Sequence, residues 1–159
     1  MSNTSPLSNL AVIGEIELLQ KIYPKVYIPP AVHSELIRFS EIQATISNAI
    51  EAGWLEIQTP KNIQFIQILN QFLDPGEAAA IALSVDIGAD RLLIDKRLGR
   101  GIALQHNVKI RGLLGLLVNA KSQRLIPVMQ PLLDRLIGEA GFRISPALYD
   151  RVLREVGES

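Results

Sequence analysis

The 159-residue sequence contains no cysteine and no long uninterrupted stretch of apolar residues. The lack of cysteine excludes disulfide bonds, thiolate zinc sites and cysteine nucleophiles, and it fits a reducing compartment. No apolar stretch approaches the roughly 20 residues that a membrane-spanning helix needs, and no basic segment followed by an apolar one marks a secretion signal at the N-terminus. We therefore expect a cytoplasmic protein that does not enter a membrane. Hydrophobic residues still make up 48% of the chain, which is enough for the core of one domain.

The formal net charge is zero, but the charges are distributed unevenly along the chain. Residues 1–90 contain 4 basic and 10 acidic side chains, whereas residues 91–124 contain 8 basic side chains and a single acid, Asp95. This basic stretch could bind the phosphates of a nucleic acid. Alternatively, its lysines and arginines are solvated on two helices that face different ways. The charge pattern alone leaves both interpretations open.

Segments typical of strands alternate with segments typical of helices. Such alternation predicts a mostly parallel sheet with helices on both faces. We expect a first strand of only Met1 and Ser2 before Asn3, shorter than a buried strand usually is, unless the true start lies upstream. The other strands are expected at 25–28, 54–58, 91–95 and 108–110. Helices are expected at 8–22, 31–39, 41–52, 62–72, 75–87, 96–107, 112–123, 128–140 and 146–156. The prediction is a single domain over 1–159, with a helical C-terminal extension from about 126.

Four polar side chains, Asn3, Glu35, Glu77 and Asp95, are expected at one edge of this sheet, because strand ends and helix starts converge there. Carboxylates gathered in one cleft repel one another, and a bound divalent cation keeps them ionised. Oxygen ligands of this kind suit Mg²⁺ or Mn²⁺. Such an ion can activate water for attack on a phosphodiester bond.

Each acid also has a simpler interpretation. Glu77 could be a first-turn glutamate that the helix dipole favours, and Asp74 could cap the same helix. Glu35 could lie on a solvated helix face. Asp95 is the strongest candidate, because it is an acid that closes an apolar strand at the edge where such folds bind ligands.

Five blocks, taken in order, resemble PIN-domain proteins. More narrowly, they are similar to the VapC-type toxin ribonucleases, the branch whose third block reads Gly-Glu-Ala. The resemblance extends over nearly the whole chain, including the tail "GFRISPALYDRVLREVGE". The blocks are "NTSPLSNL", "IPPAVHSEL", "LDPGEAAAIALS", "LLIDKRLGR" and "IRGLLGLLVNAKSQRLI".

This resemblance implies a three-layer α/β/α sandwich and Mg²⁺- or Mn²⁺-dependent endoribonuclease activity. It also implies an RNA substrate, a small antitoxin protein as the partner, and a homodimer. The metal ligands of the family fall on Asn3, Glu35, Glu77 and Asp95, the three acids being the catalytic residues. Further positions that match the family are Thr4 and Ser5, which would support the first ligand, and Arg97 and Arg100, which would contact RNA phosphates. Lys96 lies in the same basic stretch and is also expected to contact RNA.

Asn3 is the departure from the family pattern, because an acid is expected at that position. An amide oxygen can still ligate Mg²⁺, but it removes one negative charge from the ligand set. We therefore expect weaker metal binding. A second departure is Arg97, which stands two residues after Asp95 where the family often has another acid, so we expect one ion in place of two. Two functions remain open at this stage: a ribonuclease toxin, or a catalytically weakened or inactive PIN-like protein that binds RNA or another protein.

Overall fold

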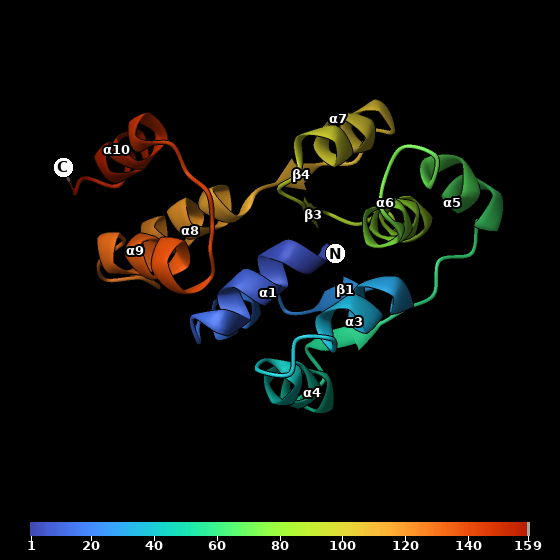
Figure 1. Ribbon diagram of the computed structural model, residues 1–159, viewed down its shortest axis with the longest axis horizontal. Coiled ribbons are helices and arrows are strands. Elements are labelled where there is room, and N and C mark those ends of the chain that lie inside the picture. Colours follow the sequence, from blue (N-terminus) through green and yellow to red (C-terminus); the bar gives the residue numbers. More distant parts are fainter. Residues whose placement is uncertain (159) are drawn as a thin grey trace.

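The computed structural model describes residues 1–158 (Figure 1) and has the predicted combination of helices and short parallel strands. The predicted C-terminal boundary at residue 159 lies outside the described residues. β1 (Val26–Ile28) pairs in parallel with β2 (Leu55–Ile57), and β3 (Leu92–Leu93) pairs in parallel with β4 (Ile110–Arg111). An α/β fold with parallel pairing is thereby confirmed, although the strands are shorter than predicted and form two two-stranded sheets in place of the single predicted sheet.

The first residues of the chain connect the two strand pairs. Ser2 forms a parallel bridge with Leu93 of β3, and the Asn3 N–H donates to the Leu93 carbonyl at 2.9 Å. On the other side, the Ser2 N–H donates to the carbonyl of Tyr27 in β1 at 3.0 Å. Figure 1 accordingly shows the N-terminus between β1 and β3. The short N-terminal segment is therefore a central member of the strand arrangement, and it places Asn3 at the carboxyl edge.

Helices follow the strands in the predicted order, with one correction in the first helix. The helix expected at 8–22 begins at Thr4 and is divided in two, because Gly14 adopts a left-handed φ of +72°. Pro6 does not delay its start, since the first N–H groups of a helix have no intrahelical partner. The helices are α1 (Thr4–Val12), α2 (Glu17–Ile22), α3 (Pro30–Leu36), α4 (Gln43–Glu51), α5 (Ile63–Leu69), α6 (Pro75–Ile87), α7 (Arg97–Gln105), α8 (Leu113–Ser122), α9 (Gln130–Glu139) and α10 (Pro146–Glu155).

Helix α6 is the best determined by local sequence. The Asp74 carboxylate accepts a hydrogen bond from the Glu77 N–H at 2.8 Å, Pro75 occupies the first helical position, and Gly88 ends the helix in the left-handed conformation. The cap at Asp74 is thus confirmed. Its alanine-rich body is buried nearly all round, so Glu77 begins a helix held firmly in the core.

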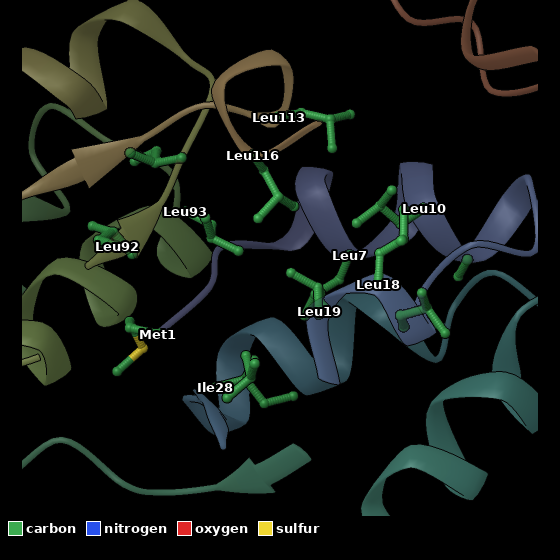
Figure 2. Packing of buried hydrophobic residues seen from close by; sticks show 14 of the residues in the cluster. Met1, Leu7, Leu10, Leu18, Leu19, Ile28, Leu92, Leu93, Leu113 and Leu116 are labelled. Carbon is green, nitrogen blue, oxygen red and sulfur yellow. The ribbon is translucent and has the colours of Figure 1, made fainter. Parts of the chain in front are cut away.

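The core joins the N-terminal segment to both halves of the chain. Figure 2 shows Met1, Leu93 of β3, Leu116 of α8 and Leu7 of α1 in one apolar cluster. Burial of each such side chain contributes roughly 1.5–3 kcal/mol to stability. These contacts fix the strand ends that carry the polar residues described below.

The C-terminal helices pack back on the rest of the chain, α9 against α1 and α10 against α8. Glu158 accepts hydrogen bonds from the N–H groups of Met129 at 2.6 Å and Gln130 at 3.0 Å, and it pairs with Lys121 at 3.2 Å. Glu158 thereby covers the start of α9. Within residues 1–158, no helix is long and apolar enough to cross a bilayer.

Candidate functional site

Asn3 and Asp95 follow the paired residues Ser2 and Leu93 at the carboxyl edge of the strands, and each has a buried, unpaired side-chain oxygen. Asn3 is 3% exposed, and its Oδ1 has no hydrogen-bond partner among the described residues. Asp95 Oδ1 accepts from the Leu113 N–H at the start of α8 at 2.8 Å, while its Oδ2 is buried and unpaired within the same part of the chain. Unpaired buried oxygens are costly and uncommon in folded proteins, so both need a partner from outside the chain.

Glu35 reaches this edge from α3. The Thr4 hydroxyl donates a hydrogen bond to Glu35 Oε2, which connects the residue after Asn3 to the second predicted acid. The same carboxylate lies against Gly76 in α6, where an added Cβ would stand 2.6 Å from Oε2. The first turns of α1 and α6 are therefore brought together around Glu35.

Glu77 is buried beside the start of α7. It is 3% exposed, and a Cβ added at Gly99 would lie 2.9 Å from its Oε2. Its Oε1 lies 3.0 Å from Lys96 Nζ, which also pairs with Asp74 Oδ2 at 2.8 Å. Lys96, predicted to contact RNA, thus lies between the carboxylates of Glu77 in α6 and of Asp74, which caps that helix.

The ionisation of this group follows from burial and from Lys96. Burial raises the pKa of Glu77, and it outweighs the opposing hydrogen bond from Lys96. Burial acts in the same direction on Asp74, but hydrogen bonds from Lys96 and the Glu77 backbone lower the pKa of Asp74 overall. Hydrogen bonds to both acids raise the pKa of Lys96, so its ammonium stays charged near neutral pH.

Arg100 lies near Asp95, and both side chains approach Gly112. A Cβ at Gly112 would meet both Arg100 Nη1, at 2.9 Å, and Asp95 Oδ1, at 3.0 Å. Burial raises the pKa of Asp95, against the Leu113 N–H and the charge of Arg100. Arg97 is exposed on α7, where it is free to meet a large ligand. Ser5 is half-buried in the first turn of α1.

Three glycines that the sequence interpretation missed accommodate the three acids. Gly76 lies against Glu35, Gly99 against Glu77 and Gly112 against Asp95. The sequence did contain a signal for them. Each glycine lies at or near the start of a helix, and those helices begin at the carboxyl edge of the strands. The absent Cβ lets the backbone come close to a carboxylate, so these glycines shape the site.

The donor set fits a divalent ion in one part of the site and not in the other. The unpaired oxygens of Asn3 and Asp95 are hard donors of the type that Mg²⁺ and Mn²⁺ prefer. Glu77, by contrast, is paired with Lys96. Among residues 1–158, no three histidine, cysteine, aspartate or glutamate side chains come together as a preformed metal-ligand group. The arrangement therefore suits an ion held near Asn3 and Asp95 better than one held by all the predicted acids.

A cavity of 420 Å³ lies elsewhere, lined by residues that include Met1, Tyr27 and Arg91. These residues start the strands or lie close to their starts, so the cavity opens at the amino edge. It includes none of the predicted site residues. The carboxyl edge, with its buried acids, is the stronger candidate for chemistry.

A family model for PIN domains matches residues 1–158. The chain belongs to the PIN-domain family. No curated protein and no solved structure gives a significant match. The predicted family is thus confirmed, and with it a nuclease-type fold whose members generally depend on divalent metals. Family membership supports hydrolytic chemistry on nucleic acid.

Proposed function

We propose that this PIN domain is a metal-dependent endoribonuclease. The observation that carries the proposal is the pair of buried, unpaired oxygens, Asn3 Oδ1 and Asp95 Oδ2, at the carboxyl edge of the parallel strands of a PIN domain. A bound Mg²⁺ or Mn²⁺ would supply an activated water and offset the negative charge that develops on the attacked phosphate. Glu35, Glu77 and Asp95 are the proposed catalytic acids.

The residues of this chain would divide the work as follows. Asn3 and Asp95 would hold the ion, and Glu35, whose carboxylate accepts a hydrogen bond from the Thr4 hydroxyl, would be a further ligand at the same edge. Ser5, in the same helical turn, would support Asn3. Arg100, next to Asp95 at Gly112, is placed to neutralise an RNA phosphate. Arg97, exposed on α7, would contact RNA further along the strand.

The finer parts of the proposal rest on the PIN family and on the basic block at 91–124. They are a three-layer α/β/α sandwich over 1–159 with a helical extension from about 126, and a place in the VapC-type toxin branch. A small antitoxin would cover the site, the chain would form a homodimer, and it would act in the cytoplasm. The concentration of basic side chains near α7 supports RNA as the substrate.

A second function is favoured by two observations at the same edge. The first ligand position carries an uncharged amide, Asn3, and Lys96 already neutralises Glu77. Both weaken the attraction for a divalent ion. The alternative is a catalytically weakened or inactive PIN-like protein that binds RNA or another protein.

Cleavage of a labelled structured RNA by the purified chain separates the two functions. The assay compares Mn²⁺, Mg²⁺ and excess EDTA under otherwise identical conditions. Internal cleavage that requires a divalent ion and stops in EDTA supports the endoribonuclease. Intact RNA under every condition, from a chain with a cooperative thermal transition, supports the binding protein instead.

A further inference from the structure

Lys96 is the first residue after Asp95, and its ammonium lies between two carboxylates of the site region. Its Nζ is 2.8 Å from Asp74 Oδ2 and 3.0 Å from Glu77 Oε1. The Lys96 side chain is 58% exposed, whereas the Glu77 side chain is only 4% exposed. An exposed stem thus carries a positive charge to a buried acid.

The pairing divides the polar edge into two parts. On one side, Lys96 compensates Asp74 and Glu77, and the other Asp74 oxygen caps α6 through the Glu77 N–H. On the other side, Asn3 Oδ1 and Asp95 Oδ2 have no hydrogen-bond partner among residues 1–158. One part therefore contains its own cation, and the other has two oxygens that are open to a donor or a cation from outside the described residues.

The geometry points to Lys96 as a built-in cation that takes the place of a second divalent ion beside Glu77. In this arrangement Glu77 anchors the ammonium, and Lys96 is a positioning residue that limits the site to a single ion near Asn3 and Asp95. The inference rests on the proposed metal-dependent function. It assigns to Lys96 a role other than direct contact with RNA.

An ordinary surface ion pair is the competing explanation. Pairs between exposed charges contribute little to stability and leave ligand binding elsewhere unchanged. Such a pair would have no effect on how many ions the chain binds. The number of bound ions therefore separates the two explanations without any measurement of catalysis.

The experiment counts Mn²⁺ ions bound per chain, by calorimetric titration and by the electron paramagnetic resonance of free Mn²⁺. The full chain is compared with Lys96→Met, which removes the ammonium but retains an unbranched stem, and with Lys96→Arg, which retains the charge. Lys61→Met is the matched control, because it removes an exposed lysine in the loop before α5. Thermal melts establish folding, and Lys96→Gln replaces Lys96→Met if that variant does not fold.

We expect one ion in the natural chain, in Lys96→Arg and in Lys61→Met, and two in Lys96→Met. One ion in all four proteins would contradict the role of Lys96 but not the metal-dependent function. Two ions bound to the natural chain would have the same meaning. No ion in the natural chain but one in Lys96→Met would support Lys96 as the cation and contradict the metal-dependent function. No ion in any protein would contradict both.

Discussion

The carboxylate of Glu35 lies directly against the backbone of Gly76, so close that a Cβ there would stand 2.6 Å from Oε2. Glu35 comes from α3 and Gly76 from the first turn of α6. This close approach places Glu35 against a residue 41 positions later in the chain, and it makes the position of Glu35 sensitive to one methyl group.

Gly76→Ala should therefore displace Glu35 while leaving the fold intact. The added Cβ meets the end of a flexible side chain, which can move, and alanine favours a helix over glycine by roughly 0.5–1 kcal/mol. We expect an unchanged or slightly higher Tm and about tenfold weaker Mn²⁺ binding, equivalent to roughly 1.4 kcal/mol. Calorimetric titration and thermal melts measure the two effects.

Gly101→Ala in α7 is the control, because nothing lies within 4 Å of a Cβ built there. It should retain Mn²⁺ binding. If both variants bind Mn²⁺ like the natural chain, Glu35 does not contribute to the ion site.

Asp95→Asn should stabilise the metal-free protein at neutral pH. Burial raises the pKa of Asp95 above its value in the unfolded chain. The ionised carboxylate therefore opposes folding, and stability falls as pH rises from the unfolded pKa of about 3.9 through the folded pKa. Asparagine keeps the acceptor for the Leu113 N–H but carries no charge. A gain of about 1 kcal/mol would raise Tm by roughly 2–4 °C.

Thermal melts in EDTA at pH 7 and at pH 4 test whether Asp95→Asn raises or lowers the stability of the metal-free protein. The advantage of Asp95→Asn should shrink at the lower pH, where the natural carboxyl group is more fully protonated. A variant less stable than the natural chain at pH 7 would show that Arg100 and the Leu113 N–H outweigh burial.

Asp74 should act as a cap whose function survives replacement by asparagine. Asp74→Ala removes the acceptor of the Glu77 N–H and should cost about 1 kcal/mol, or roughly 2–4 °C in Tm. Asp74→Asn keeps a capping oxygen and should stay closer to the natural chain. Equal losses in the two variants would assign the stabilisation to the charge facing Lys96, since only that charge is removed in both.

RNA affinity should fall steeply with salt, with part of the slope due to Arg97. Each phosphate contact on single-stranded RNA contributes about −0.7 to the slope of log K against log salt. Arg97→Ala should reduce the magnitude of the slope by about that amount, measured by fluorescence anisotropy in EDTA. Arg151→Ala is the control and should leave the slope unchanged, because Arg151 is on α10, at the left of Figure 1, whereas α7 lies at the upper right. An equal slope in the natural chain and in both variants would show that Arg97 on α7 does not contact RNA phosphates.

Much of the fold followed from local signals in the sequence. Asp74, Pro75 and Gly88 determine both ends of α6 through interactions within a few residues, so its limits could be predicted. The division of the first helix at Gly14 was missed, because helical spacing of apolar residues continues across the break. The central place of Met1–Asn3 depends on hydrogen bonds to β1 and β3, which lie far away in the sequence.

The candidate site residues could be proposed from the sequence, but the pairing among them could not. Asp95 was proposed because it closes an apolar strand, and Asn3, Glu35 and Glu77 because strand ends and helix starts converge at one edge and because they match the family. Lys96 was assigned to RNA since it lies in a basic stretch, yet it is 22 residues from Asp74 and 19 from Glu77, and only the tertiary structure brings them together. Local patterns carry no information about such pairs.

The most direct measurement compares the rate of metal-dependent RNA cleavage by Asp95→Asn and by Asp134→Asn. Both change one carboxylate to an amide, but Asp134 lies on α9, where it accepts a hydrogen bond from the Tyr149 hydroxyl. The account predicts at least about a hundredfold loss in Asp95→Asn, as expected when a group essential to the chemical step is removed, and a natural rate in Asp134→Asn. Equal cleavage by the two variants would contradict a catalytic site at the Asn3–Asp95 edge.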